Sequence, residues 1–170
     1  MAIRSNHYDA AFEAYLLATG RPFVAIDEAR RAQLAEVSLK SMDFIVDGGS
    51  HRLLLDIKGR RFPTGGSSGN RWECWADEDD IASLLRWETV FGNQYRAALV
   101  FAYHITDSQW HPLHPVRWEY AGRVYAFYAV WVRDYARQMR TRSPRWATVA
   151  LRKPDYAQLR CPWEEFSRGV

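Results

Sequence analysis

The sequence is poor in the residues that mark a disulfide scaffold, a zinc site or a membrane span. It has two cysteines, Cys74 and Cys161, which lie far apart in the chain. So few cysteines exclude a disulfide framework and a cysteine-based zinc site, and we expect two free thiols in a reducing compartment. No apolar run approaches the length of about 20 residues that a membrane-spanning helix needs. Residues 1–7 contain no apolar signal core, so we expect a cytoplasmic protein without a membrane partner.

Lysine is also scarce. Only three basic residues are lysines, Lys40, Lys58 and Lys153, while the other basic residues are arginines. A lysine in such a chain can mark a position that needs a compact ammonium group. The net charge is only +3, but residues 107–170 carry 11 basic and 6 acidic residues, against 12 and 14 in residues 1–106. This basic C-terminal part suits a polyanionic partner, and it is equally compatible with a solvated arginine-rich surface.

What the sequence does contain is material for one core. The chain has 170 residues, of which 48% are hydrophobic and 15% aromatic. This length and composition fit a single domain over residues 1–170 that folds without disulfides or a structural metal. We find no repeats and no interdomain linker.

The pattern of apolar residues and turn residues predicts alternating helices and strands. Strands over 97–105 and 124–132 are apolar on both faces, which favours layers on both sides of a sheet. We therefore expect an α/β fold, a central mixed β-sheet flanked by helices on both faces. The expected elements are a helix over 6–17, a strand over 23–26, a short helix after Asp27 carrying Arg30 and Arg31, strands over 42–46 and 52–58, a loop over 62–70, a helix over 79–91, and strands over 97–105, 124–132 and 146–151.

The strands over 42–46 and 52–58 are joined by a turn of glycine, aspartate and serine, so they should form an antiparallel hairpin. Residues two apart on a strand point to the same face, so Asp56 and Lys58 should project together. Asp56 interrupts an apolar strand. A carboxylate so close to a core is costly unless it is paired or binds a metal.

These residues have the chemistry of a metal-dependent phosphodiesterase. Asp43 on one strand and Asp56 on its neighbour offer hard oxygen ligands, which suit Mg²⁺ with Mn²⁺ as a substitute. Lys58 beside the metal can orient the attacking water or offset charge on the phosphoryl group. Glu13, on the first helix, could be a third oxygen ligand or could pair with Lys58 or an arginine. A structural ion-pair cluster is the alternative interpretation of these four residues.

Four stretches carry a resemblance to known nucleases: His7-Tyr8-Asp9-Ala10-Ala11-Phe12-Glu13, Asp27-Glu28-Ala29-Arg30-Arg31, Lys40-Ser41-Met42-Asp43-Phe44 and Asp56-Ile57-Lys58-Gly59-Arg60-Arg61-Phe62-Pro63. They resemble the PD-(D/E)XK, restriction-endonuclease-like superfamily. They are similar in particular to the bacterial HYExAFE family and to archaeal-type Holliday junction resolvases, which also place a glutamate on the first helix. Asp9 departs from the glutamate of the HYExAFE name, keeping the charge with a shorter reach.

The resemblance implies a core of a helix, three strands, a helix and a strand. It also implies Mg²⁺-dependent cleavage of phosphodiester bonds in nucleic acid, with DNA of a repair or recombination type as the expected substrate. The superfamily residues Glu13, Asp43, Asp56 and Lys58 are all present.

Five further residues are weaker candidates for contacts with nucleic acid. His7 and Tyr8 begin the first helix, where they could touch phosphate or simply pack the helix start. Arg60 and Arg61 follow the strand that carries Lys58 and could grip the backbone. Gln94 could orient the nucleophilic water or make a polar contact at the end of a helix.

Two functions of other classes also fit the sequence. One is a non-catalytic nucleic-acid-binding module on the same scaffold, which the basic C-terminal part supports. The other is a structural homodimer partner, because the apolar strand over 124–132 and eight tryptophans could form a large interface.

Overall fold

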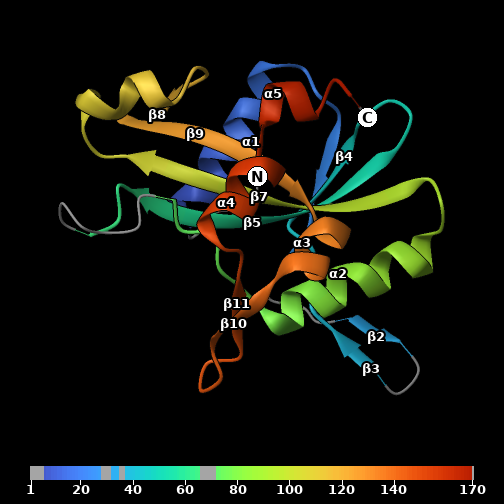
Figure 1. Ribbon diagram of the computed structural model, residues 1–170. Coiled ribbons are helices and arrows are strands. Elements are labelled where there is room, and N and C mark those ends of the chain that lie inside the picture. The colour runs from blue at the N-terminus through green and yellow to red at the C-terminus, as the bar shows by residue number, and fades with distance from the viewer. Residues whose placement is uncertain (1–5, 28–31, 35–36, 66–71, 170) are drawn as a thin grey trace.

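The computed structural model describes residues 6–27, 32–34, 37–65 and 72–169. One seven-stranded sheet forms its centre, in the order β1-β4-β5-β7-β9-β12, with β8 paired to β9 (Figure 1). The strands of this sheet are β1 (Phe23–Ala25), β4 (Phe44–Asp47), β5 (Arg52–Phe62), β7 (Tyr95–Ile105), β8 (Trp118–Tyr120), β9 (Arg123–Trp131) and β12 (Cys161–Pro162).

Helices cover both faces of the sheet, which confirms the predicted fold class. Helices α1 (His7–Ala18) and α5 (Trp163–Phe166) cover one face, and α2 (Glu78–Phe91), α3 (Val132–Gln138) and α4 (Lys153–Leu159) cover the other. Alternation along β5 separates the two cores. Leu53 and Leu55 pack in the α1 layer, whereas Leu54 packs in the α2 layer.

The pairing of β5 with β7 places α2 beside the sheet. These two strands run parallel, from Arg52↔Tyr95 to Phe62↔Ile105, whereas the other described pairs of this sheet are antiparallel. A parallel pair needs a crossover connection. The segment through β6 (Ala76–Asp77) and α2 provides it and brings the N-terminus of α2 to the face of β5.

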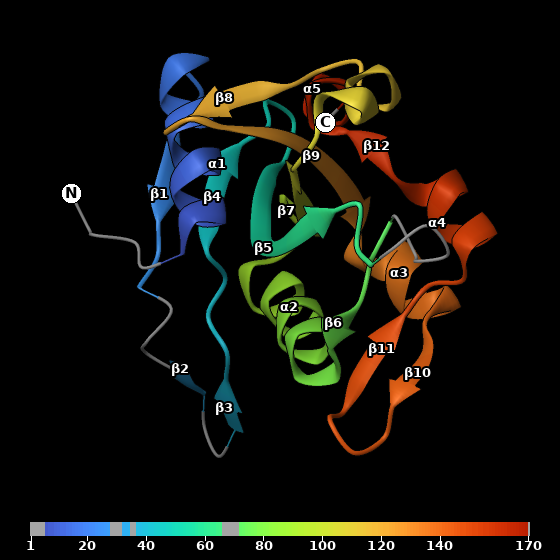
Figure 2. The ribbon, with the colours of Figure 1, turned by 90° about the vertical axis from the view of Figure 1, so that its left-hand side faces the viewer.

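Strands β4 and β5 form the predicted hairpin and then separate (Figure 2). Their regular pairing runs from Asp47↔Arg52 to Phe44↔Leu55, and the amide of Asp43 still donates to the Leu55 carbonyl at 2.8 Å. Asp43 therefore lies just before its strand rather than inside it. β5 continues four residues beyond the predicted end, and its part after Leu55 has an edge that β4 does not cover.

Two small hairpins extend on either side of α2 (Figures 1 and 2). One is formed by β2 (Ala32–Leu34) and β3 (Val37–Leu39). The other, which we call the β10–β11 arm, consists of β10 (Arg140–Ser143) and β11 (Thr148–Ala150), and β11 also pairs with β6. The predicted short helix after Asp27 falls mostly on residues outside the described part of the chain.

Some predicted boundaries were wrong because apolar residues continue past the end of a strand. The expected strand over 124–132 ends at Trp131, and α3 begins at Val132, where Val132 and Tyr135 bury one helical turn against the sheet. The expected strand over 146–151 is limited to β11. The 3₁₀ helix η1 (Ser108–Leu113) and the short strands β8, β10 and β12 were not predicted.

Burial within the chain also bears on the expected homodimer. Residues 125–130 of β9 are all buried between the two helical layers of the same chain. This strand is therefore not available as the dimer interface that its apolar composition suggested.

Both cysteines are free, as predicted, with Cys74 buried and Cys161 half-buried. Among the described helices, none combines the length and the hydropathy that crossing a membrane requires.

Candidate active site

Asp56 and Lys58 project together from β5 toward α2, as the alternation of the strand predicted. The Lys58 Nζ lies 2.6 Å from the Asp56 Oδ2. Their neighbours Leu55 and Ile57 point the other way, into the α1 layer. A buried strand thus carries two charged side chains on one face, at the level where β4 turns away.

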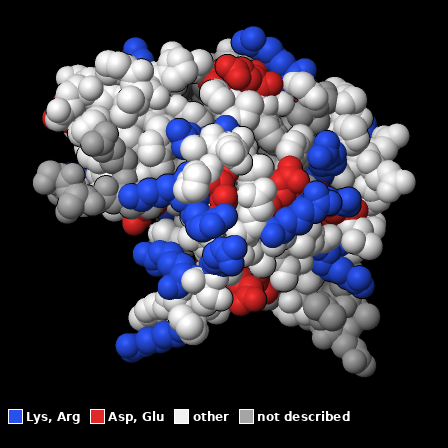
Figure 3. Space-filling view, in the orientation of Figure 1, with Lys and Arg blue, Asp and Glu red and all other residues white. Residues whose placement is uncertain are grey.

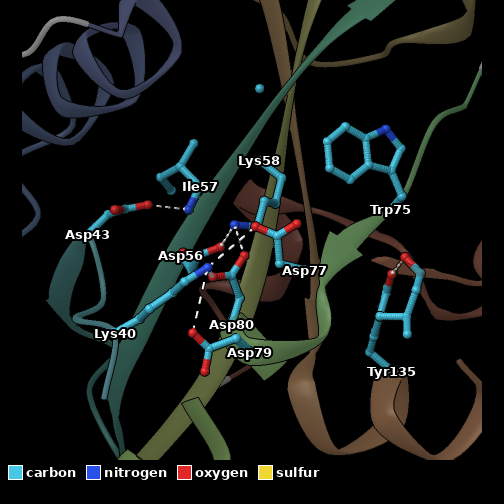
Figure 4. A network of polar contacts seen from close by, with 12 residues as sticks. Lys40, Asp43, Asp56, Ile57, Lys58, Trp75, Asp77, Asp79, Asp80 and Tyr135 are labelled. Carbon is cyan, nitrogen blue, oxygen red and sulfur yellow. Dashed lines mark hydrogen bonds and ion pairs between the residues drawn. The ribbon is translucent and has the colours of Figure 1, made fainter. Parts of the chain in front are cut away.

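Asp80 is the third member of this cluster, and sequence reasoning missed it. It lies in the first turn of α2, and its Oδ2 is 2.6 Å from the Lys58 Nζ. Its other oxygen, Oδ1, is 2.7 Å from the Lys40 Nζ, so Asp80 bridges two lysines (Figure 4). The run of acidic residues at 77–80 is what a helix N-terminus ordinarily carries to complement its dipole. The scarcity of lysine was the signal that could have drawn attention to Lys40.

Lys40 also reaches the rest of the acidic turn. Its Nζ lies 3.4 Å from the Asp77 Oδ2 and 3.9 Å from the Asp79 Oδ2. Both of these carboxylates are far more exposed than that of Asp80, so they contribute less.

The network keeps its members charged. Burial alone would lower the pKa of Lys58, but the carboxylates of Asp56 and Asp80 outweigh burial and raise that pKa. Burial would raise the pKa of Asp80, but Lys58 and Lys40 outweigh it and lower that pKa. The pKa of Lys40 is raised because Asp80 and Asp77 outweigh the effect of burial. At neutral pH Lys58 and Lys40 are therefore ammonium groups, and Asp80 is a carboxylate.

Asp43 is fixed at the point where β4 and β5 part. Its Oδ2 accepts a hydrogen bond of 2.5 Å from the amide of Ile57, so a carboxylate replaces the backbone carbonyl that a continuing strand would offer. Asp43, one residue before the pair Phe44↔Leu55, therefore lies beside the part of β5 that carries Asp56 and Ile57. The side chains of Asp43 and Asp56 are both buried.

Asp43 and Asp56 are the residues that could offer carboxylate oxygens to Mg²⁺. The ion binds one or two carboxylates and completes its shell with water and phosphate oxygens. Within the described ranges, no three His, Cys, Asp or Glu side chains form a group that could hold a metal. Glu13, half-buried on α1, is thus not gathered with the two aspartates into a three-carboxylate cage.

A surface pocket of about 300 Å³ opens beside the uncovered edge of β5. It joins the N-terminus of α1 to the N-terminus of α2. Gly59 and Tyr8 both line the pocket. They lie so close together that a Cβ atom at position 59 would overlap the Tyr8 ring. The lining residues are Asn6, Tyr8, Ile57, Lys58, Gly59, Arg60, Trp75, Asp77 and Asp80.

Arg60 is a buried cation in the wall of this pocket. It is 8% exposed, and its guanidinium stacks 3.9 Å from the centre of the Trp75 ring. It donates to two backbone carbonyls, those of Gly59 and Trp75, and its Nε has no hydrogen-bond partner among the described residues. Burial lowers its pKa. A buried charge without a bound carboxylate is costly, so Arg60 could bind an anionic group, although Asp77 and Asp80 also line the pocket.

The remaining candidates lie at different distances from the cluster. Tyr8 lines the pocket, and His7 next to it forms a hydrogen bond of 2.8 Å with the Tyr125 hydroxyl. Arg61 is exposed on the α1 face. Gln94 lies beside Arg52 at the other end of β5, six residues or about 20 Å of strand from Lys58. The structure does not bring Gln94 to the pocket.

Comparisons with known proteins agree with this fold. No family model matches the sequence, and no curated protein matches it either. Among solved structures, the chain is similar to Hjc, a Holliday junction resolvase from the archaeal hyperthermophile Archaeoglobus fulgidus. The TM-score is 0.56 at 12% sequence identity, over 95% of this chain and 98% of the resolvase. The chain therefore shares the mixed α/β fold of this resolvase.

Proposed function

We propose that the chain is a metal-dependent endonuclease that hydrolyses phosphodiester bonds in nucleic acid, with DNA of a repair or recombination type as its substrate. The observation that carries this proposal is the placement of Asp43, Asp56 and Lys58 where β4 and β5 separate, beside a pocket with a buried arginine. The nuclease fold supports the proposal. The resemblance to the HYExAFE family is consistent with it.

In this proposal each residue has a defined task. Asp43 and Asp56 would hold Mg²⁺ or Mn²⁺, and Glu13 would act through water if it takes part. The metal would supply a Lewis acid and lower the pKa of its bound water. Lys58 would hold the attacking water and offset charge on the phosphoryl group, and Asp80 would keep the ammonium in the pocket.

Arg60 would bind the phosphate that enters the pocket. Its guanidinium is already held by Trp75 and by two carbonyls, so little conformational freedom is lost when an anion binds. The Tyr8 ring against Gly59 would form the opposite wall.

The β10–β11 arm supports a nucleic-acid partner. Arg140, Arg142 and Arg145 are exposed on it and form no ion pair with the described carboxylates. Arg142 lies 5.1 Å from the ring of Trp75, so the arm continues the wall of the pocket. Figure 3 shows basic side chains gathered over this side of the molecule. Such a surface binds a phosphate backbone without reading sequence.

One observation favours the second candidate, a non-catalytic binding module. Lys58 is held at 2.6 Å by two carboxylates, which is also the geometry of a structural ion-pair cluster. Such a module would bind nucleic acid in a salt-sensitive manner and would not need a metal.

A substrate panel distinguishes these functions. Branched DNA, linear duplex, single strand and RNA are incubated with the protein in Mg²⁺, in Mn²⁺ and in EDTA. We expect cleavage with either metal and none in EDTA. Salt-sensitive binding to the same substrates, without cleavage under any of these conditions, would instead support the binding module.

A further inference from the structure

A row of basic and aromatic side chains crosses the sheet on the α1 face, behind the candidate active site. Arg61 on β5 pairs with His104 on β7, and His104 pairs with Tyr125 on β9. All three belong to the face that packs against α1, since Ala102 and Phe127 of the preceding row lie in that core. The row therefore places three polar side chains of neighbouring strands next to one another.

Helix α1 adds its first residue to this row. His7 forms a hydrogen bond of 2.8 Å with the Tyr125 hydroxyl, and its ring centre lies 5.9 Å from that of His104. The ring centres of His104 and Tyr125 are 5.6 Å apart. Tyr125 is fully buried, and the imidazoles of His7 and His104 are half-buried, so these three rings form the buried part of the row.

Two exposed arginines lie at the solvent-facing border of this row. Arg61 belongs to the row itself, and Arg123 precedes Tyr125 by two residues on β9. Neither forms an ion pair or a hydrogen bond with any described carboxylate. Arg61 lies opposite His104 in the register of β5 and β7, and Arg123 shares the face of Tyr125 two residues away on β9, so both arginines border the row.

Basic groups and burial determine the titration of the two imidazoles. Burial and Arg123 lower the pKa of His7. Burial, His7, Arg123 and Arg61 lower the pKa of His104. Among the residues that the structure describes, the titratable groups that act on one another in this row are His7, Tyr8, Arg61, His104, Tyr120, Arg123 and Tyr125, and none of these is a carboxylate.

We propose that His7, Arg61, His104, Arg123 and Tyr125 form a binding site for a second backbone phosphate of the nucleic-acid substrate. We call it the rear phosphate site. The inference rests on the proposed function, and it adds His104, Arg123 and Tyr125 to the residues that bind substrate. Guanidinium groups and imidazole or hydroxyl donors on one surface are the groups that bind phosphate oxygens.

The rear phosphate site is continuous with the pocket. Tyr8 lines the pocket and its ring lies 3.9 Å from that of His7, between the two places. Lys58 and Arg61 are three positions apart on β5, which is about 10 Å of strand. Lys58 faces α2 and Arg61 faces α1, so the nucleic-acid backbone would reach the rear site around the edge of β5 that β4 does not cover.

A purely structural role explains only part of this arrangement. The bond between His7 and Tyr125 fastens the start of α1 to the sheet, and that task needs no cation. The two exposed arginines take no part in that bond, and their position beside the imidazoles suits an anion.

The first test is binding of a labelled oligonucleotide to the full chain by fluorescence anisotropy, without metal, in an Asp56→Ala background that removes cleavage. We expect the double variant Arg61→Ala/Arg123→Ala to bind roughly tenfold more weakly or worse. Its salt dependence should fall by about one phosphate contact, a change of about 1 in the slope of log K against log salt. The matched control is Arg137→Ala/Arg152→Ala, which removes two exposed arginines that are ion-paired with Asp134 and Asp155. Equal losses in both double variants would overturn the rear phosphate site.

The second test observes the imidazoles directly. Titration of the His7 and His104 ring protons by NMR should show both pKa values rising when the oligonucleotide binds, and no rise in the Arg61→Ala/Arg123→Ala variant. Oligonucleotides with a 5′-phosphate and with a 5′-hydroxyl should have the same effect, because the ligand is an internal phosphodiester. A rise with inorganic phosphate and the 5′-phosphate alone would assign the site to a terminal phosphate and overturn our proposal. No rise with any of them would also overturn it.

These tests separate the rear site from the proposed function. Binding that depends on Arg61 and Arg123, in a protein that cleaves nothing, would contradict the endonuclease and leave the rear site standing. Cleavage that is lost in Asp56→Ala, together with binding that ignores both arginines, would do the reverse.

Discussion

Lys58 and Asp80 are joined by a contact of 2.6 Å between Nζ and Oδ2, although they are 22 residues apart in sequence. One lies on β5 and the other in the first turn of α2, and both side chains are largely buried, at 16% and 6% exposure. This contact ties the crossover helix to the strand that carries the candidate catalytic residues. It also holds the ammonium of Lys58 next to the carboxylates of Asp56 and Asp80 (Figure 4).

The first prediction concerns Asp80. Asp80→Ala leaves two lysines without their shared carboxylate, so we expect a loss of about 3 kcal/mol in the free energy of unfolding. Asp79→Ala, which removes a half-exposed carboxylate 3.9 Å from Lys40, should cost less than about 0.5 kcal/mol. Urea denaturation at an unchanged m-value measures both. Similar values for the two variants would show that Asp80 has no special place in the network.

The second prediction is the pH dependence of this contribution. The pKa of Asp80 is lowered from its ordinary value of 3.8, so its stabilising effect is present above that value and is lost as the pH falls through the folded-state pKa. The pKa of Lys58 is raised from 10.5, so its effect is complete below that value and is lost as the pH rises through its folded-state pKa. The difference in unfolding free energy between wild type and Asp80→Asn should therefore be constant between these limits and shrink beyond both. A difference that changes between pH 6 and pH 8 would contradict the assignment.

The third prediction concerns the wall formed by Gly59 and Tyr8. Gly59→Ala places a Cβ into the Tyr8 ring, so α1 or β5 must shift, at a cost of about 1–3 kcal/mol. Tyr8→Ala removes the obstacle, and the double variant should lose clearly less stability than the sum of the single variants. Thermal or urea unfolding of the four proteins in the cycle measures this coupling. Additive losses would mean that the two residues do not press on each other.

The fourth prediction tests the metal ligands apart from any substrate. Asp56→Asn and Asp43→Asn should each weaken Mn²⁺ binding by at least tenfold, measured by isothermal titration calorimetry. Asp43→Asn should keep most of its stability because the amide oxygen can still accept from Ile57. Asp47→Asn, an exposed aspartate in the hairpin turn, is the control and should bind the metal like the wild type. The same weakening in all three variants would point to a nonspecific effect of charge.

The sequence predicted those features that depend on short-range patterns. The period of two along residues 52–58 placed Asp56 and Lys58 on one face, and the turn after Asp47 predicted the hairpin with β4. Asp43, Asp56 and Lys58 follow directly from these two elements. Helices on both faces followed from strands such as β7, which is apolar on both sides.

What the sequence could not show depends on contacts across long distances. Nothing local in Asp80 separates it from its acidic neighbours, and only the crossover of α2 brings it to Lys58. Nothing in the sequence distinguishes Tyr125 and His104 from other strand residues. Only the register of β7 and β9 and the fold of α1 bring them together with His7. Gln94 was a candidate because it follows a helix. That helix, however, ends beside Arg52 at the start of β5, far from Lys58.

The most direct test of the central claim is the rate of cleavage of the best substrate from the panel, in Mg²⁺, by wild type, Asp56→Asn and Asp47→Asn, with folding of each verified by circular dichroism. We predict that Asp56→Asn loses cleavage by a factor of at least about 100, while it still binds the substrate, and that Asp47→Asn matches the wild type. Undiminished cleavage by a folded Asp56→Asn protein would contradict the assignment of this site.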